Sequence, residues 1–422
     1  MKLSELSPEI CAMARRAEAR IAPAFSAMEE VAMANTRRVM EAFQDNRVSE
    51  ACFAGTTGYG YDDLGREVLE KIYAQVFGTE AALVRLNFVN GTHAITAALF
   101  ALCRPGEKIL AVTGAPYDTL RQAIGTEGDA FGSLRFYGVG YSQVELNGAG
   151  EPDLPAIRKA LQEESVKAVI LQRSCGYADR KTLSIDDIRA LAAFIRENRP
   201  DVSIFCDNCY GEFTEELEPT HVGVDLIAGS LIKNPGGGIA PTGGYIAGRA
   251  ELVQRAAFRL TSPGIGGECG STLGYNRLLF QGLFLAPHVV LQALKTAAFA
   301  AAMTEELGLA SKPAAEDRRS DIIQRISLGT AENMKAFCRG IQGGAPVDSF
   351  VTPEPWPMPG YSCDVIMADG SFIQGSSIEL SADGPYQPPY NVFLQGGLTY
   401  ESGRLGIMMA VQEMKKIMDA GR

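Results

Sequence analysis

The sequence is poor in histidine: its 422 residues include only His93, His221 and His288, in unrelated contexts. Zinc sites are built largely from histidine and cysteine, and the candidate ligands here do not cluster, so we expect no metal site. The nine cysteines form an odd, scattered set, which argues against a disulfide framework and is typical of a reducing compartment. Cys206 and Cys209 form a CxxC pair at the expected end of a strand, whereas thioredoxin-like redox pairs begin a helix.

Positive charge is also scarce, since the formal net charge is -11 and the isoelectric point is near 5.0. This balance disfavours a broad attraction to nucleic acid or to an anionic membrane. The most apolar long segment, residues 283–303, is interrupted by Pro287, His288, Gln292 and Lys295, so we expect a buried helix rather than a membrane span. The N-terminal stretch MKLSELSPEICAMARRAEAR lacks the apolar core of a signal peptide, and we expect a cytoplasmic protein.

What the sequence does contain is an alternation of strand-like and helix-like patterns through its middle. This alternation predicts an α/β fold with a mainly parallel sheet flanked by helices. Strands are expected at residues 81–89, 108–113, about 134–141, 166–172, 202–207, 224–230 and 243–248, and helices at 64–77, from Gly91 onward, at 154–163 and at 185–197.

Three domains are expected along the chain. Residues 1–55 read as an N-terminal helical arm of two helices, with a break at Ile21-Ala22-Pro23. Residues 56–285 would form the large domain. Residues 286–422 would form a smaller α+β domain, in which period-two runs such as CDVIMA and SIELSA indicate an antiparallel sheet and a final helix covers residues 404–418.

A lysine and an aspartate follow two of the expected strands. Lys233 comes shortly after the apolar run 224–230, and Asp207 ends the run VSIFCD. Ligands of open α/β sheets bind at the carboxyl ends of strands. An amine and an acid there fit pyridoxal 5'-phosphate (PLP), whose aldehyde needs an amine and whose ring nitrogen needs an anion. Desolvation near other positive groups would lower the pKa of Lys233. A solvated loop lysine and ordinary turn chemistry at the aspartate are the alternatives.

Two further features could serve such a cofactor. Gly91 and Thr92 begin a helix directly after a strand, and free N–H groups at a helix start bind phosphate. The same residue types also cap helices for structural reasons. Tyr117 follows the next strand, where its ring could lie over a cofactor and its phenol could move a proton. It could equally be an ordinary loop tyrosine.

Arginines are candidates for holding a substrate carboxylate. Gln172, Arg173 and Ser174 follow another strand, and Arg404 begins the final helix. A guanidinium can bind a carboxylate through two hydrogen bonds, or it can pair with an acid on the surface. The loop with Tyr59 and Tyr61 could lie on a partner subunit or pack on its own helix.

The order of Gly91-Thr92, Tyr117, Asp207, Ser230 and Lys233 resembles fold-type I PLP-dependent enzymes, the aspartate aminotransferase and cystathionine lyase superfamily. The segments QRSCGY, DNCYGEF, GSLIKNPGGGIAPTGGYIAG, GLFLAPHVV, PVDSFVTPEPWPMPGY and SIELSADGP resemble the aluminium-resistance, or methionine gamma-lyase-like, family. The likeness extends over essentially the whole chain and implies a PLP-dependent transferase-like fold with a seven-stranded sheet.

The resemblance also implies roles for single residues. Lys233 would bond the cofactor, Asp207 would face its ring nitrogen, and Tyr117 would stack on the ring. The phosphate would be held by Gly91, Thr92 and Ser230, while Gln172 would lie near the phenolic oxygen. Tyr59 or Tyr61 would reach in from a neighbouring subunit of a homo-oligomer, either a dimer or a tetramer. Cystathionine lyases carry threonine before the lysine, whereas Ile232 stands here, and their carboxylate-binding arginine has another context, which leaves Arg173 and Arg404 as competing candidates.

By this resemblance the expected reaction is PLP-dependent elimination from a sulfur-containing amino acid, as in methionine gamma-lyase or cystathionine beta-lyase. Transamination, racemisation or aldol cleavage on the same scaffold is the alternative. A PLP-binding protein with a tolerance role and no turnover is another. A nicotinamide-binding Rossmann enzyme is disfavoured because no GxGxxG opens a helix after a strand.

Overall fold

The computed structural model describes residues 3–127, 131–178, 180–358 and 363–420. The chain forms two compact units. The large unit is residues 35–284, and the small unit combines residues 1–34 with residues 285–422. The segment expected to be a separate arm, 1–55, is thus divided between the two units.

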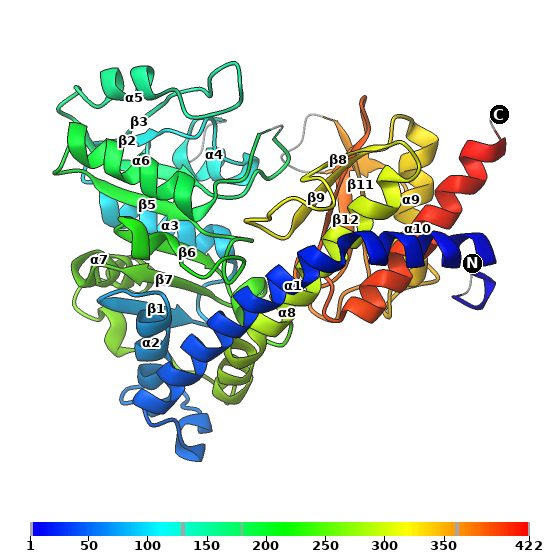
Figure 1. The fold of residues 1–422 in the computed structure, drawn as a ribbon. Coiled ribbons are helices and arrows are strands. Elements are labelled where there is room, and N and C mark those ends of the chain that lie inside the picture. Colours follow the sequence, from blue (N-terminus) through cyan, green and yellow to red (C-terminus); the bar gives the residue numbers. More distant parts are fainter. Residues whose placement is uncertain (1–2, 128–130, 179, 359–362, 421–422) are drawn as a thin grey trace. The chain divides into compact units, whose positions relative to one another are not determined.

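The large unit is built on a seven-stranded sheet with the strand order β1-β7-β6-β5-β4-β2-β3 (Figure 1). Strands β6, β5, β4, β2 and β3 are parallel, whereas β7 is antiparallel to both of its neighbours, β1 and β6. This arrangement confirms the predicted α/β class with a mainly parallel sheet. The strands are β1 (Ala81–Arg85), β2 (Lys108–Ala111), β3 (Gly140–Gln143), β4 (Val166–Gln172), β5 (Ser203–Asp207), β6 (Leu226–Ser230) and β7 (Gly244–Gly248).

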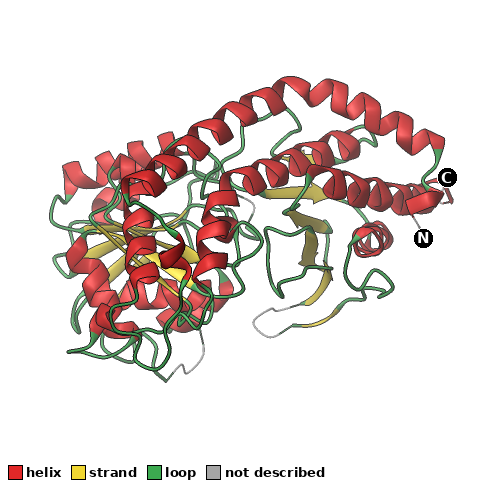
Figure 2. Ribbon diagram, turned by 90° about the horizontal axis from the view of Figure 1, so that it is seen from below, coloured by secondary structure: helices red, strands yellow, loops and turns green. Residues whose placement is uncertain are grey.

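Helices flank this sheet, as the red and yellow ribbons of Figure 2 show. They bury the apolar strand residues that the sequence presents as near-continuous runs, a pattern typical of a sheet covered on both faces. The core of the unit includes Leu99, Ile109, Phe205 and Ile246. The helices that belong wholly to this unit are α2 (Leu64–Val76), α3 (Gly91–Leu102), α4 (Asp118–Ile124), α5 (Leu154–Ala160), α6 (Ile185–Asn198) and α7 (Ala250–Leu260).

The small unit carries a six-stranded antiparallel sheet with the order β10-β11-β12-β13-β9-β8, as the sequence predicts. Helices α9 (Ala331–Gly344) and α10 (Tyr400–Ala420) pack against each other. They share one apolar core with the sheet, and this core includes Phe337, Ile366 and Ile407. The strands are β8 (Ala310–Lys312), β9 (Ile323–Ser327), β10 (Trp356–Pro357), β11 (Asp364–Asp369), β12 (Ser381–Pro385) and β13 (Asn391–Gln395).

Two long helices run through both units, α1 (Pro8–Asp45) and α8 (Asn276–Glu305). Short 3-10 helices complete the fold at Leu3–Glu5, Glu50–Phe53, Pro219–Val222, Asn234–Gly236 and Gly266–Glu268. By length and composition α8 could cross a membrane, but 72% of its apolar window is buried inside the protein. Core helices meet the same criterion, and we interpret α8 as one of them.

Three local predictions are wrong. The N-terminal region is a single helix with Pro23 inside it, because its buried face continues from Ile10 and Ile21 to Val39 beyond the proline and outweighs one missing backbone hydrogen bond. The strand expected at 134–141 begins only at Gly140, since residues 134–138 form turns. In SIELSA only the last two residues join β12, because the Glu379 carboxylate accepts backbone hydrogen bonds from Phe372 and Ile373 and holds this segment in a loop.

Candidate active site

Asp207 and Lys233 come together at the carboxyl ends of two neighbouring parallel strands. Asp207 is the last residue of β5 and pairs with Ala228 of β6, and Lys233 follows β6 after a short turn. Asp207 is buried, and its Oδ1 atom accepts a hydrogen bond from the Cys209 N–H at 3.1 Å. Both residues therefore lie at the same edge of the sheet, close enough for their charges to interact.

The electrostatics of this pair are those of an acid and an amine that share a buried space. Burial raises the pKa of Asp207, and the positive charge of Lys233 opposes that rise. Burial alone would lower the pKa of Lys233, but the acidic groups around it, with Cys209 first and Tyr210 and Asp207 next, outweigh burial and raise it. The expectation of a lowered pKa is wrong for this arrangement, because the neighbours of Lys233 are acidic rather than positive.

Tyr210 forms one wall of the lysine site. The Nζ atom of Lys233 lies 4.0 Å from the centre of the Tyr210 ring, a distance at which the ring face attracts a cation. Tyr210 has a φ of 72° and Phe213 a φ of 62°, so two non-glycine residues of the loop after β5 adopt the left-handed conformation. Such strain persists only where the surroundings over-determine it.

A second cluster of polar groups lies at the start of α3. A Cβ atom on Gly91 would be only 3.1 Å from the Cβ of Ser230, so the helix start lies beside the end of β6. Among the described residues, the buried Ser230 hydroxyl has no hydrogen-bond partner. The Tyr117 hydroxyl donates to Thr92 Oγ1 at 3.0 Å. Burial is the main cause that raises the pKa of Tyr117, so its phenol stays protonated.

Gln172 links this cluster to the Asp207 strand. It pairs with Asp207 across β4 and β5, and its Oε1 atom accepts a hydrogen bond from the Tyr117 N–H at 3.0 Å. The structure thus brings together the following residues of the predicted site: Gly91, Thr92, Tyr117, Gln172, Asp207, Ser230 and Lys233.

The prediction that Arg173 binds a substrate carboxylate is wrong. Its side chain is fully buried and is held by acids of the same unit, with Glu215 at 3.2 Å and Glu218 at 3.5 Å. Its Nη1 atom also donates to Asn208 Oδ1 at 2.9 Å. A buried arginine paired with two carboxylates has its charge compensated inside the protein. Arg173 therefore stabilises the loop that follows Asp207.

The other predicted residues make contacts within their own units. Arg404 belongs to the small unit, where its Nε and Nη2 atoms donate to the two carboxylate oxygens of Glu18 at 2.7 and 3.0 Å. Tyr59 and Tyr61 stack on each other in the large unit with ring centres 5.7 Å apart, and they are 72% and 56% exposed. Their predicted contact with a neighbouring subunit stays a prediction.

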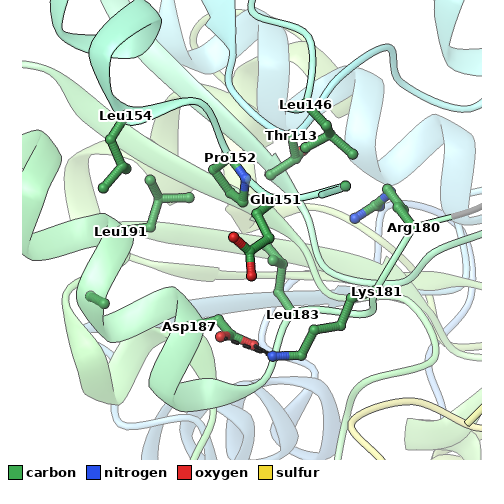
Figure 3. Close-up of a pocket in the computed structure, with 12 residues that line it drawn as sticks. Thr113, Leu146, Glu151, Pro152, Leu154, Arg180, Lys181, Leu183, Asp187 and Leu191 are labelled. Carbon is green, nitrogen blue, oxygen red and sulfur yellow. Dashed lines mark hydrogen bonds and ion pairs between the residues drawn. The ribbon is translucent and has the colours of Figure 1, made fainter. Parts of the chain in front are cut away.

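A cavity of about 220 Å³ opens next to the site, between the end of β2, the 146–154 loop and α6. Figure 3 shows its leucine side chains, with the Glu151 carboxylate and the Lys181–Asp187 ion pair among them. Two lining residues contact the backbone of Gln172, because Thr113 Oγ1 accepts from its N–H and Arg180 donates to its carbonyl oxygen. None of the predicted site residues is among those that line the cavity.

Tyr210 and Glu212 are not among the residues predicted from the sequence. Both lie in the segment DNCYGEF, which was used only as a family motif. An aromatic residue and an acid directly after the strand-end aspartate were the available signal, because a short loop there stays beside the site.

The chain is similar to known proteins over most of its length. The family described as "Methionine gamma-lyase" matches residues 10–415. The uncharacterized protein YnbB of Bacillus subtilis (strain 168) is 49% identical over 95% of both chains. The crystal structure of a carbon-sulfur lyase involved in aluminium resistance from Clostridium novyi NT has a TM-score of 0.93 and 49% identity, with 96% of each chain covered. The pyridoxal-5'-phosphate dependent protein YhfS from Escherichia coli is only 16% identical, with 93% of this chain and 97% of that chain covered and a TM-score of 0.62, and shows the shared fold.

Proposed function

Because the chain belongs to the methionine gamma-lyase family, whose members use PLP, we propose that it cleaves a carbon–sulfur bond of a sulfur-containing amino acid. The observation that carries the proposal is that the buried side chains of Asp207 and Lys233 lie together at the ends of neighbouring strands. The name of the Clostridium novyi relative, a carbon-sulfur lyase, supports the same reaction class.

The residues of the site fit this cofactor. The buried Ser230 hydroxyl without a partner among the described residues is a donor ready for a phosphate oxygen. The absence of a side chain at Gly91 keeps the start of α3 open beside it, and the N–H groups of a helix start favour an anion. Thr92 would add a hydroxyl, as its place next to the Tyr117 phenol suggests. Ser230 supplies its hydroxyl although Ile232 stands where related lyases have threonine.

When bound, PLP bonds an amino group through its aldehyde and withdraws electrons through its ring. Lys233 would hold the aldehyde and, once displaced, take the α proton of the amino acid with its freed amine. Asp207 would keep the ring nitrogen protonated through its negative charge. Gln172 would lie near the phenolic oxygen of the cofactor.

Tyr117 would cover the ring with its own ring and give a proton to the departing sulfur. The raised pKa of its phenol means that the proton is present at neutral pH, as a general acid requires. The carbon–sulfur bond would break to release a thiol, and one water would hydrolyse the remaining imine to ammonia and a 2-oxo acid, with no net oxidation.

We further propose that the active form is a homo-oligomer. The stacked and exposed rings of Tyr59 and Tyr61 support a contact with a second copy, because exposed aromatic groups of this kind are enriched at interfaces.

Product analysis of the PLP-loaded protein tests the function. L-methionine and L-cystathionine are supplied separately, and thiol, ammonia and 2-oxo acid are measured, with Lys233→Ala as the control. The proposal expects equal amounts of the three products from at least one substrate and none from the control. A requirement for a second 2-oxo acid, with no thiol released, would contradict it and identify amino-group transfer.

A further inference from the structure

Glu212 is a buried acid that the proposed reaction does not use. Its side chain is fully enclosed in the large unit. The Tyr245 hydroxyl donates to its Oε1 atom at 2.8 Å, while among the described residues Oε2 has no hydrogen-bond partner. Burying a carboxyl with one unsatisfied oxygen costs folding free energy, so we expect it to have a role that explains its place in the core.

The position of Glu212 ties it to the lysine strand and loop. A Cβ atom on Gly229 would lie 2.6 Å from Glu212 Oε1, so the carboxyl lies against β6 directly before Ser230. The Nδ2 atom of Asn234, the residue after Lys233, donates to the Glu212 carbonyl oxygen at 3.0 Å. Glu212 also interacts electrostatically with Lys233. The backbone of Glu212 therefore supports the turn that carries Lys233, while its carboxyl lies against the preceding strand and interacts with the charge of Lys233.

A buried hydrogen-bond chain connects Glu212 to the loop behind Asp207. The Asn208 Nδ2 atom donates to Tyr245 at 3.4 Å and to Glu218 Oε2 at 3.0 Å, and Arg173 donates to Asn208 from the other side. Tyr210 and Phe213, which flank Gly211 and Glu212, both have a left-handed backbone, and the Tyr210 ring contacts Lys233. The strained backbone and the hydrogen bonds thus fix the position of the loop after β5 relative to Asp207 and Lys233.

We propose that Glu212 is a positioning residue for Lys233 and acts as a second buried acid besides Asp207. When Glu212 loses its proton, the positive form of the lysine nitrogen becomes more strongly favoured. This inference rests on the proposed function, because it assigns Lys233 to the cofactor. Glu212 itself touches neither substrate nor cofactor in this proposal.

Glu212 is suited to gain and lose a proton within the pH range in which an enzyme is assayed. Burial, the largest cause, raises its pKa to about 8, and the backbone N–H of Glu212, the Tyr245 hydrogen bond and the charge of Lys233 oppose the rise. Burial raises the pKa of the neighbouring thiols and phenols far above that range. The titratable and charged groups that face Glu212 are Tyr73 of α2, Cys206 of β5, Cys209 and Glu218 of the following loop, Lys233 after β6 and Tyr245 of β7.

The test is a pH titration of the absorption spectrum of the PLP-loaded protein, without substrate. Wild type is expected to show an inflection near pH 8, because ionised Glu212 favours the protonated lysine nitrogen above that pH. Glu212→Gln keeps a neutral side chain of the same shape and should lose the inflection, with an unchanged spectrum on the acid side. Tyr245→Phe removes a hydrogen bond that favours ionised Glu212, so the inflection should move to higher pH by roughly half to one unit.

The outcomes separate this inference from the function on which it rests. If borohydride fixes the cofactor at Lys233 but the titrations of wild type and Glu212→Gln superimpose, the role of Glu212 is refuted while the function stands. If no cofactor bonds to Lys233 at all, the function fails first. A purely structural role would change the amount of bound cofactor at every pH and would leave the inflection in place.

Discussion

The ammonium group of Lys233 lies over the face of Tyr210, with Nζ 4.0 Å from the ring centre. This contact joins the two loops that follow β5 and β6, the strands whose ends define the site. It also places an aromatic wall behind the amine, on a residue whose backbone is left-handed. The position of the lysine therefore depends on the loop after Asp207 as well as on its own strand.

Removing the Ser230 hydroxyl should affect the cofactor and not the fold. The hydroxyl is buried without a partner among the described residues, so Ser230→Ala is expected to leave the free energy of unfolding of the cofactor-free protein unchanged or higher. PLP affinity should fall about ten- to a hundredfold, because a hydrogen bond to a charged group contributes about 1.5–3 kcal/mol. Fluorescence titration and denaturant unfolding measure the two quantities.

A matched serine provides the control for that variant. Ser184 caps α6 by accepting the Asp187 N–H, so Ser184→Ala should lower stability by about 1 kcal/mol and leave PLP affinity unchanged. The same loss of PLP affinity in both variants would contradict the phosphate role of Ser230.

A methyl group at position 211 should break the buried network around Arg173. A Cβ atom there would lie 2.4 Å from Arg173 Cδ and 2.6 Å from its Nε, and the guanidinium cannot retreat because acids hold it. Gly211→Ala should cost about 2–4 kcal/mol of folding free energy. Gly148→Ala is the control, since no atom of the described residues lies within 4 Å of its added Cβ. Equal stability of the two variants in urea would show that the network is not rigid.

The fold was predictable because the strand and helix patterns of the large unit are local and strong. The pairing of Lys233 with Asp207 was predictable because parallel strands end at the same edge of a sheet. Arg173 was misinterpreted because its partners, Glu215 and Glu218, lie about forty residues further along the chain, and a single sequence does not pair distant charges. The uninterrupted helix through Pro23 depends on packing along the whole buried face, which a local proline rule does not see.

Replacing the Tyr117 hydroxyl should slow the chemistry while the ring stays in place. If the phenol protonates the leaving sulfur, Tyr117→Phe should lower kcat by about a hundredfold or more, with little change in PLP content. Thr92 accepts the hydrogen bond of this phenol, so Thr92→Val, which leaves the phenol intact, should retain most of kcat and lose some PLP affinity. Steady-state kinetics on the best substrate measure these changes, and an unaltered kcat in Tyr117→Phe would remove the phenol from the reaction.

Low pH should weaken the hydrogen bonds of Asp63, which hold the loop that carries Tyr59 and Tyr61. Burial tends to raise the pKa of Asp63, but hydrogen bonds from Thr272 and Thr56 dominate together and lower it. A lowered pKa in the folded state means that this stabilisation is present above the unfolded value, near 3.9, and is lost as the pH falls through the folded value. Asp63→Asn should therefore be less stable near neutral pH and lose less stability on acidification. Urea unfolding from pH 7 to pH 3 measures both effects, and parallel curves for the two proteins would contradict this reading.

The most direct test of the account is the site of covalent attachment of PLP. The loaded protein is reduced with borohydride and digested, and the modified peptide is sequenced by mass spectrometry. The account predicts the label on Lys233 alone, and its loss in Lys233→Ala. A label on any other lysine, or a protein that binds PLP without any reducible bond, would contradict it.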